Sequence, residues 1–421
     1  MIKKESKEKR TILIHEVHDM WPKTLVDVGG MKKSNPFVRL MQIGENYSYK
    51  TADYVASTLE FSEKHMNSHG LKDGKFRYIP NGISKKDWEV TQSIPKKHEE
   101  QLKALKKDNK FIVGYFGGFA VSNALDVLMD AAKKIKKTDI QFVLVGEGNQ
   151  KKRLQKRIRE EKIRNVLFLD PIPKKSIPDL LQYFDCVYMG VQTEKEIYKY
   201  GVSFTKMYDS MMAGCPILMN MSDVRAPVEQ IECGIRCNVH DKDAICKGIE
   251  YLYSMSEKER ILLGENGKRA VIENFEYGCL AEKYEQLFPK DTKNILLINH
   301  YAGSLEMGMD FRPFYLGREW VEKGYNVTIL AADYSHLRRK NPIVNYNFQS
   351  ECIEGINYQW IKTIKYSGNG LKRAITMLQF VSVAWFHAKS IAKSIQPDVI
   401  ITASTYPLDM FASNRIKKYL L

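Results

Sequence analysis

Phe111–Gly118 reads FIVGYFGG, and Asn294–Gly303 reads NILLINHYAG. Each is a short apolar run that ends in glycine, and the first opens onto an amphipathic segment, Ala124–Lys134. Both resemble the first strand of a parallel α/β domain, and fully apolar strands of this length are expected where helices cover both faces of a sheet. Two such starts in 421 residues indicate two domains, because this length exceeds one ordinary core.

Further apolar runs alternate with amphipathic segments along the chain, which is the pattern of α/β domains. A second expected helix is Ile177–Tyr183. Besides the two runs above, the expected strands are Thr11–Val17, Gln141–Val145, Val166–Leu169, Cys186–Met189, Asn326–Ala331 and Asp398–Thr402. The expected fold is therefore α/β, with two Rossmann-like domains.

The order of these elements is unusual. The domain that begins at Asn294 has too few strands for a stable doubly wound sheet, and Thr11–Val17 has no earlier strand to pair with. Placing 294–421 before 1–83 gives a full βαβ series. We therefore expect one split, circularly permuted domain of 1–83 plus 294–421, a second domain of 84–285, and a linker of 286–293. The alternative is that the sequence is an excerpt from a tandem array, in which each half-domain belongs to a different neighbouring domain. Two exposed half-sheets would, however, promote aggregation.

The composition restricts the class of protein. Hydrophobic residues make up 44% and charged residues 27%, which indicates a globular chain. The 65 Lys and Arg against 50 Asp and Glu give a formal charge of +15, which favours anionic partners such as phosphorylated substrates or acidic headgroups, or reflects solvated lysines. Nucleic acid is disfavoured as a partner, because the basic residues are dispersed and no known motif orders them.

The location in the cell is expected to be cytoplasmic, or peripheral on the inner face of the membrane. The charged start MIKKESKEKR has no apolar signal region, and no apolar run is long enough to span a bilayer. The seven cysteines form no C-x-x-C pairs, so buried free thiols are expected.

The stretch Tyr200–Leu218, YGVSFTKMYDSMMAGCPIL, carries the clearest chemistry. Lys206 and Asp209 are three residues apart and so share one face of an expected helix that starts near Ser203. A lysine at a helix N-terminus suits a diphosphate, and a carboxylate one turn later can accept both hydroxyls of a ribose. The glycine pair Gly117–Gly118 likewise permits close backbone approach to a phosphate, although such pairs also occur in plain turns.

With its flanking sequence, this region resembles glycosyltransferase family 4. The motifs that carry the resemblance are the glycine pair, the sequence VGEG at Val145–Gly148, the block around Lys206, the stretch Ala226–Gly234 and the hinge-like YIPNGI at Tyr78–Ile83. Outside them, four segments are similar to the N-terminal domain of the family, in the branch of bacterial polysaccharide and N-acetyl-L-fucosamine transferases. These are His15–Pro22, Asn299–Trp320, Ala331–His336 and Thr402–Asp409. The family order of the pieces agrees with the permutation.

The resemblance implies a two-Rossmann-domain (GT-B) fold and a retaining transfer from a nucleotide-diphosphate sugar, UDP-linked, to a glycan or polyprenyl-diphosphate-linked acceptor in cell-surface polysaccharide synthesis. It implies catalytic roles for His18 and Asp19. The implied donor-binding residues are Gly117, Gly118, Gly201, Val202, Ser203, Lys206, Asp209 and Glu229. The implied acceptor-side residues are Gly303, Ser304, Gly308, Met309 and Arg312, of which Arg312 has a pair with Glu319 as its alternative role.

One departure from the family bears on activity. The family commonly has two acidic residues eight apart, but the position eight before Asp209 is Gly201. A binding protein without turnover, left from a fragmented gene, is therefore an alternative, and a UDP-sugar epimerase is another. No D-x-D pair follows an expected strand, and no His/carboxylate cluster with metal spacing is found, so we expect a metal-independent reaction, no metal site and no cofactor.

One long helix is expected at Gly370–Lys393, with an apolar middle and basic ends. It fits an interfacial helix that binds an anionic leaflet. A core helix packed on the sheet is the equal alternative.

Overall fold

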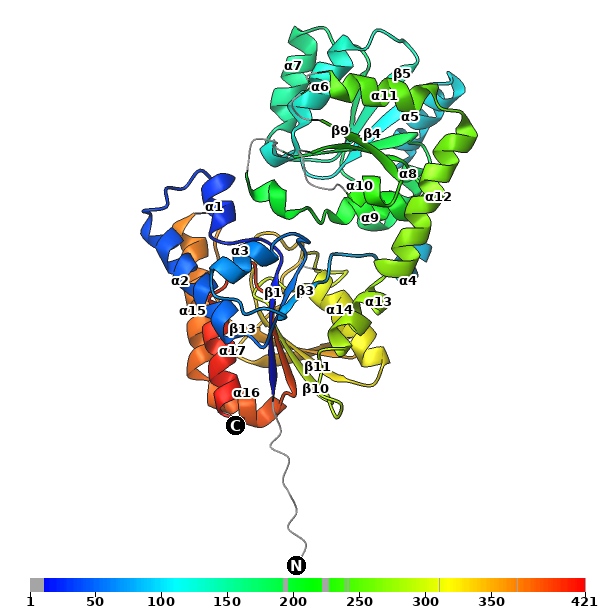
Figure 1. Ribbon diagram of the computed structural model, residues 1–421. Helices are drawn as coiled ribbons and strands as arrows, with labels where there is room; N and C mark the ends of the chain where they lie inside the picture. The colour runs from blue at the N-terminus through cyan, green and yellow to red at the C-terminus, as the bar shows by residue number, and fades with distance from the viewer. Residues whose placement is uncertain are drawn as a thin grey trace, which may run out of the picture. The chain divides into compact units, whose positions relative to one another are not determined.

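The computed structural model describes residues 11–191, 196–221, 227–238, 241, 243–309, 311–368 and 370–420. The chain divides into two compact units (Figure 1). Unit 1 comprises Met1–Pro80 and Tyr277–Leu421, and unit 2 comprises Asn81–Glu276. The charged segment 1–10 lies outside the described residues, and the expectation about a signal peptide was based on it. Two residues of the motifs above also lie outside them, Ala226 of Ala226–Gly234 and Asp310 of Asn299–Trp320.

Unit 1 contains an eight-stranded sheet with the order β12-β13-β11-β10-β14-β1-β2-β3. All neighbours pair in parallel except β12 and β13, which are antiparallel. The strands are β1 (Ile12–Val17), β2 (Tyr54–Ser57), β3 (Phe76–Tyr78), β10 (Asn294–Ile298), β11 (Asn326–Ala332), β12 (Gln349–Ile353), β13 (Ile356–Ile361) and β14 (Val399–Thr402).

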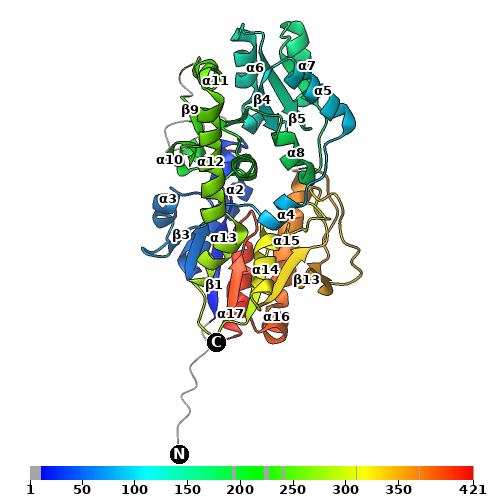
Figure 2. The same ribbon diagram turned by 90° about the vertical axis from the view of Figure 1, so that its right-hand side faces the viewer.

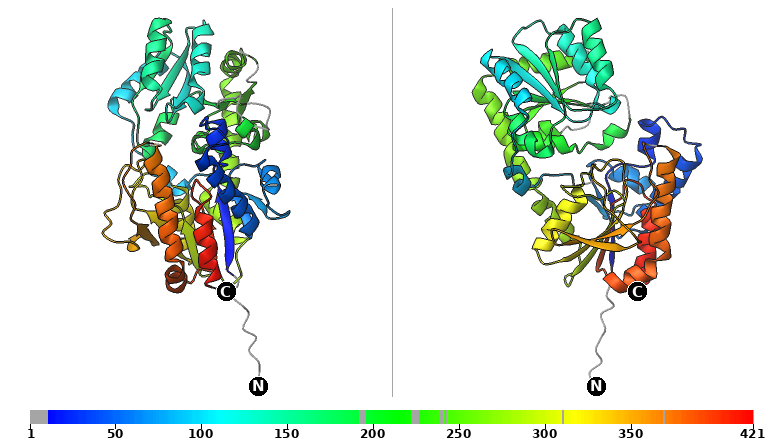
Figure 3. Two further views of the ribbon diagram at one scale, coloured as in Figure 1. Left: turned by 90° about the vertical axis from the view of Figure 1, so that its left-hand side faces the viewer. Right: turned by 180° about the vertical axis from the view of Figure 1, so that it is seen from behind.

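Strands from the two ends of the sequence meet at the centre of this sheet. Strand β1 pairs with β14 on one side, with Ile12 opposite Val399, and with β2 on the other, with Ile14 opposite Tyr54. Figure 3 shows β1 beside α17 (Asp409–Lys418), a helix from the far end of the chain, and the two elements are in contact. The N-terminal and C-terminal segments thus share one sheet.

Helices cover both faces of the unit 1 sheet. Helices α2 (Pro36–Thr51), α15 (Leu371–Phe386), α16 (Ala388–Ile395) and α17 lie on one face, and α13 (Tyr277–Glu285) and α14 (Arg312–Glu322) lie on the other (Figure 1). The two short helices of this unit are α1 (Lys23–Asp27) and α3 (Glu63–Ser68).

The boundary between the units differs from the sequence expectation. Helix α13 was expected in the 84–285 domain, and 286–293 was expected to be a linker. In the structure, Tyr277, Leu280 and Tyr284 of α13 are buried in the core of unit 1, and the Tyr277 ring stacks on that of Tyr315 from α14. An amphipathic pattern shows that a helix has a buried face, but not which sheet that face covers.

Unit 2 contains a six-stranded parallel sheet with the order β6-β5-β4-β7-β8-β9. Its strands are β4 (Phe111–Phe116), β5 (Ile140–Val145), β6 (Val166–Leu169), β7 (Cys186–Gly190), β8 (Ile217–Asn220) and β9 (Gly234–Cys237). Every residue of β4 is buried, as expected of a central strand with helices on both faces.

Helices lie against both faces of the unit 2 sheet (Figure 2). An apolar core on each face holds them there. One core includes α5 (Lys96–Lys107), α8 (Ile177–Leu181), α9 (Thr205–Met212) and α12 (Glu257–Asn274). The other includes α6 (Leu125–Lys134), α7 (Lys151–Glu160) and α11 (Ala244–Ser254). The short helices are α4 (Lys85–Glu89) and α10 (Pro227–Gln230).

Local sequence explains several of these boundaries. Helix α2 begins with Pro36 after Asn35, whose side chain accepts a hydrogen bond from Phe37 N. Ser256 and Glu259 form a reciprocal capping box at the start of α12. Within β4, Gly114 is required because a Cβ there would lie 2.0 Å from the Phe184 ring.

The expected strands and the α/β class with two parallel-type sheets are confirmed, whereas two details are wrong. The helix expected at 370–393 is broken at His387 into α15 and α16. All seven cysteines are free, but Cys352 is exposed rather than buried. Among the described residues, no helix has both the length and the apolar character needed to cross a bilayer.

Candidate functional site

The glycine pair of unit 2 follows β4 directly, at the carboxyl end of the central strand. Gly117 has a φ of +128°, a conformation that favours glycine. The carbonyl of Gly118 accepts hydrogen bonds from Tyr115 OH at 2.6 Å and from Asn123 Nδ2 at 2.8 Å. These two side chains fix the loop in one conformation.

Lys206 lies beside this loop, although it is 83 residues beyond Asn123 in the sequence. Its Nζ donates to Asn123 Oδ1 at 3.2 Å and lies 4.6 Å from the centre of the Tyr115 ring. Among the described residues no carboxylate pairs with it. Burial lowers the pKa of Lys206 to about 8, because the ammonium charge loses hydration. At pH 7 the group is still mostly charged.

These contacts connect Gly118, Asn123 and Lys206 in one chain of hydrogen bonds. Glycine backbone that a ligand can approach closely, next to a half-buried ammonium group, is an arrangement suited to a phosphate group. The carboxyl ends of parallel strands are also where α/β folds bind ligands. The arrangement can therefore hold an anion such as a diphosphate.

Asp209 lies on the same helix as Lys206 but is almost fully buried, with 4% of its surface exposed. Burial raises the pKa of Asp209, and the charge of Lys174 opposes that shift. Within the described part of the chain, its carboxylate accepts no hydrogen bond. The group is thus available to a hydroxyl donor.

The other predicted donor-side residues have mixed surroundings. Gly201, with a φ of +102°, and Val202 are buried in the segment before α9. Ser203 binds Asn81 twice, since its Oγ accepts from Asn81 N at 2.9 Å and its carbonyl accepts from Asn81 Nδ2 at 2.8 Å. Glu229 pairs with Arg236 at 2.8 Å. In this structure Ser203 and Glu229 make contacts within the protein.

In unit 1, His18 and Asp19 follow the carboxyl end of β1. The Nε2 atom of His18 lies 2.5 Å from Oε1 of Glu16, a carboxylate with 1% of its surface exposed. The same oxygen accepts from Arg312 Nε at 3.2 Å, and the other oxygen accepts from Tyr284 OH. His18 is thus anchored to a buried, charged network.

This network has a strong electrostatic effect on Glu16. Burial alone would raise the pKa of its carboxyl, but the charge of Arg312, followed by that of His18 and the hydrogen bonds from His18 and Tyr284, holds it well below its ordinary value. Glu16 is therefore ionised at neutral pH. A fixed carboxylate beside an imidazole orients the ring and stabilises its protonated form.

The position of Arg312 differs from the expectation. It was expected to shape the acceptor side, or to pair with Glu319, but it is 2% exposed and its guanidinium binds Glu16 and the carbonyls of Ile79 and Pro80. A guanidinium with these internal partners holds Glu16 in place instead of facing an acceptor. Its partner, 296 residues away in the sequence, could not be predicted from spacing.

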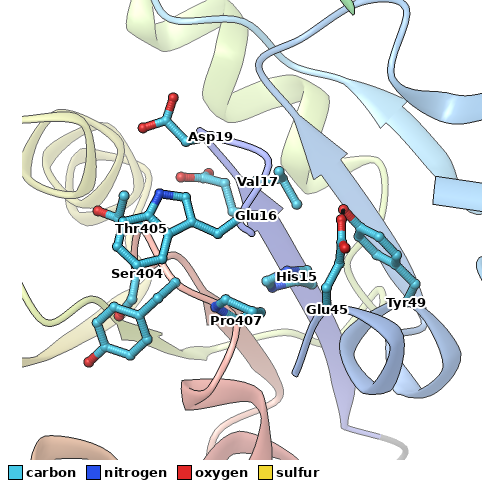
Figure 4. Close-up of a pocket in the computed structure, with 11 residues that line it drawn as sticks. His15, Glu16, Val17, Asp19, Glu45, Tyr49, Ser404, Thr405 and Pro407 are labelled. Carbon is cyan, nitrogen blue, oxygen red and sulfur yellow. Dashed lines mark hydrogen bonds between the residues drawn. The ribbon is translucent and has the colours of Figure 1, made fainter. Parts of the chain in front are cut away.

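Asp19 lines a pocket together with Glu16, His15 and Glu45, and the 404–407 turn after β14 forms its opposite wall (Figure 4). His15 is buried and its pKa is lowered to about 4 by desolvation, so its ring is neutral at pH 7. The pocket thus has ionisable groups of different character at the carboxyl edge of the unit 1 sheet.

The predicted acceptor-side loop folds back on itself between β10 and α14. Gly308 N donates to Ser304 O at 2.9 Å, and a Cβ on Gly303 would lie 2.0 Å from the Gly308 carbonyl. Gly303, Ser304 and Gly308 are buried, whereas Met309 is 47% exposed. Of these four residues, Met309 is therefore the one whose side chain is open to solvent.

Sequence reasoning missed three features. Glu16 could have been noticed, because a carboxylate within an apolar strand needs a buried partner. Asn123 was not among the predicted site residues, although it joins Lys206 to the glycine loop. The expectation of no His/carboxylate cluster is wrong, since Glu45, His65 and His69 lie together. The four-residue spacing of the two histidines was the available signal.

Comparison with known proteins agrees with this geometry. Residues 96–270 match the family described as Glycosyl transferases group 1. The chain is 21% identical over 271 residues to "Probable glycosyltransferase WbjE" of Pseudomonas aeruginosa, covering 64% of this chain and 66% of that protein. The chain therefore spans just under two thirds of the length of this curated relative.

Solved structures share the fold. Anabaena Alr3699/HepE in complex with UDP matches with a TM-score of 0.51 and 15% identity, over 66% of this chain and 71% of that one. Its complex with UDP-glucose matches with a TM-score of 0.50 and 17% identity, over 66% and 72%. WaaG, a glycosyltransferase involved in lipopolysaccharide biosynthesis, matches with a TM-score of 0.50 and 13% identity, over 66% and 76%. The fold of the chain is that of these GT-B proteins.

Proposed function

We propose that this chain, whose residues 96–270 match the group 1 glycosyl transferase family, is a retaining transferase that uses a UDP-sugar. The acceptor would be a glycan or a polyprenyl-diphosphate-linked sugar in cell-surface polysaccharide synthesis. The observation that carries the proposal is the contact of Lys206 with the Gly117–Gly118 loop through Asn123, because glycine backbone beside an ammonium group suits a diphosphate. The UDP complexes of HepE support UDP as the nucleotide.

The donor would be bound by groups of unit 2. The backbone at Gly117 and Gly118 would contact the diphosphate, and Lys206 would neutralise the negative charge that grows on it as it leaves. Asp209 would accept the ribose hydroxyls, and the Gly201–Ser203 backbone would hold the sugar. The proposed chemistry needs no metal at the donor, because the lysine supplies the positive charge that a leaving diphosphate requires.

The reacting centre would involve His18 of unit 1. The acceptor hydroxyl oxygen forms a bond to the anomeric carbon on the face from which the diphosphate departs, and its proton passes to the leaving phosphate oxygen. His18 would contact the donor sugar, and Asp19 would lie beside it. Glu16 and Arg312 are positioning residues in this scheme, because they act through His18.

A panel of nucleotide sugars tests the donor assignment. We expect UDP and a UDP-sugar to raise the melting temperature of the protein, GDP- and dTDP-sugars to do so less, and Lys206→Ala to lose the UDP shift. An unchanged shift in Lys206→Ala would remove this lysine from the site. Binding with no transfer and no hydrolysis of any UDP-sugar would favour the alternative that Gly201 motivates, a binding protein without turnover.

We also propose that unit 1 is a circularly permuted form of the family's N-terminal domain. The pairing of β1 between β14 and β2 supports it, because neither chain segment alone provides the whole sheet. A gene that encodes 290–421, then 11–289, with a short linker should give a monomer with the same UDP-induced thermal shift, because Leu287 is part of the core of unit 1. An obligate strand-exchanged oligomer of the original chain would instead favour the tandem-array interpretation.

A membrane-facing role for α15 is part of the proposal. Its solvent-facing stripe contains apolar side chains, among them Leu371 at 78% and Phe386 at 73% exposed. Exposed lysines lie near both ends of this helix, Lys372 on α15 and Lys389 on α16. Such a helix suits an anionic bilayer surface. Leu371→Ser with Phe386→Ser should reduce co-sedimentation with anionic vesicles, whereas Leu262→Ser, at an exposed leucine on α12, should not. Equal sedimentation of both variants would contradict this role.

A further inference from the structure

A cluster of three potential metal ligands lies in unit 1 and includes none of the residues proposed for catalysis. Glu45 belongs to α2, His65 belongs to α3, and His69 is the C-cap of α3. One ligand atom from each side chain lies within 4.8 Å of the others. We propose that these residues bind a divalent transition-metal ion of the zinc type, which joins α2 to α3.

The two histidines are arranged as a pair. They are four residues apart, so one helical turn places them side by side, and their rings stack with centroids 4.1 Å apart. His69 Nδ1 lies 2.9 Å from the His65 carbonyl oxygen, so the ring donates a proton there. Metal-binding histidines usually have such a second hydrogen bond, which fixes the ring and leaves the other nitrogen with its lone pair.

Glu45 provides the negative charge. Its carboxylate is 2% exposed, and Oε1 lies 2.9 Å from His65 Nε2. Its other hydrogen-bond donors among the described residues are Gln42 Nε2, at 2.7 Å, and Tyr49 OH, at 3.2 Å, and both are neutral. No lysine or arginine in the described part of the chain pairs with it. A buried carboxylate without a permanent cation is costly, and a divalent ion would offset that cost.

The donor set determines the kind of metal. Two imidazole nitrogens and one carboxylate oxygen suit zinc and neighbouring first-row ions, whereas Mg²⁺ and Ca²⁺ prefer oxygen ligands alone. His65 and His69 are half-buried, so an ion and a water can reach them. Bound metal would replace the direct His65–Glu45 hydrogen bond by two coordinate bonds.

The expected consequence is structural. Glu45 also lines the pocket that contains Asp19 and His15, so an ion on Glu45 would fix one wall of that pocket (Figure 4). An ion that binds the folded protein and not the unfolded chain raises the melting temperature by mass action. This site is independent of the donor site in unit 2, and its test requires no nucleotide sugar.

Metal titration of the full chain tests the proposal. After removal of metal by a chelator, we expect the protein to bind one equivalent of Zn²⁺ in competition with a chromogenic indicator and to melt at a higher temperature. His69→Gln should weaken this binding at least about tenfold. His387→Gln, which changes an exposed histidine at the junction of α15 and α16, should bind Zn²⁺ like the unaltered protein.

Co²⁺ provides a readout that is independent of stability. The unaltered protein with one equivalent of Co²⁺ should show visible absorption bands of an ion with imidazole ligands, and these bands should be lost in His65→Asn. A circular-dichroism spectrum of each metal-free variant confirms that it is folded. Zn²⁺ binding that is equally tight in His69→Gln, or no binding by the unaltered protein at tens of micromolar Zn²⁺, would overturn the proposal.

Discussion

The Nε2 atom of His18 lies 2.5 Å from Oε1 of Glu16, and Glu16 is in turn held by Arg312 and Tyr284. The strand end that carries the proposed catalytic histidine is thus connected to the first residue of α14 and to α13. This connection is buried, so a change in Glu16 should affect both the stability of unit 1 and the orientation of His18.

A comparison of Glu16→Gln with Tyr284→Phe separates these two effects. Glu16→Gln should lower kcat for sugar transfer at least about tenfold and alter its pH profile, because the imidazole loses its carboxylate partner. The variant should also unfold more readily, by about 3–5 kcal/mol, since Arg312 is left buried without its counter-charge. Tyr284→Phe is the matched control, because it removes one hydrogen bond to Glu16 and keeps the carboxylate beside His18. Equal kcat values and pH profiles for Glu16→Gln and Tyr284→Phe would contradict the positioning role.

Lys206 should make UDP binding sensitive to pH. Its pKa in the free protein is about 8, so the ammonium form that binds a diphosphate becomes scarce above that pH. The dissociation constant for UDP should rise about tenfold between pH 7 and pH 9, measured by calorimetry. Lys206→Arg should not show this rise, because a guanidinium stays charged. A flat profile in the unaltered protein would mean that Lys206 does not contact the diphosphate.

Gly118→Ala tests the close approach of the backbone to the ligand. A Cβ at this position meets no heavy atom within 4 Å, and Gly118 does not have the positive φ that makes Gly117 difficult to replace. The melting temperature should therefore change by no more than about 2 °C. UDP should bind at least about tenfold more weakly, because the added methyl group occupies the space of a phosphate. Normal UDP affinity in a stable variant would place the phosphate elsewhere.

Asp409 should make the stability of the protein depend on pH. Its side chain is fully buried at the start of α17, and burial raises the pKa of its carboxyl to about 7. The folded protein therefore keeps a proton that the unfolded chain loses above about pH 4, and this contribution to stability falls as the pH rises from about 4 to about 7. The contribution is complete below that range.

Asp409→Asn removes this dependence. The asparagine oxygen can still accept from Ser404 N, which donates to Oδ2 of Asp409 at 3.1 Å. We compare the unfolding free energy of Asp409→Asn with that of the unaltered protein by urea denaturation. The difference should shift in favour of Asp409→Asn by on the order of 2 kcal/mol as the pH rises from 5 to 8. A difference between the two proteins that does not change with pH would show that Asp409 titrates normally.

The periodicity of apolar residues predicted the strands, because a run such as FIVGYF at β4 has no solvent-facing side. It could not predict that α13 packs in unit 1, since Tyr277 and Tyr284 would be equally apolar against either sheet. The break at His387 was also not evident, because the residues around it are ordinary helix formers.

Long-range polar contacts were the least predictable part of the site. The Lys206–Asp209 spacing correctly placed both residues on one helix, but the contact of Lys206 with Asn123 depends on the crossover of the unit 2 sheet. The Glu16–Arg312 pair similarly depends on two segments at opposite ends of the chain. Such pairs are set by topology, which local sequence patterns do not encode.

The most direct test of the central claim is the fate of a UDP-sugar, followed by NMR, with and without an extract of lipid-linked acceptors. The account predicts UDP release that depends on the extract, a product with the anomeric configuration of the donor, and loss of both in Lys206→Ala and His18→Ala. Conversion of the UDP-sugar into an isomeric UDP-sugar without any acceptor would contradict the account and identify an epimerase.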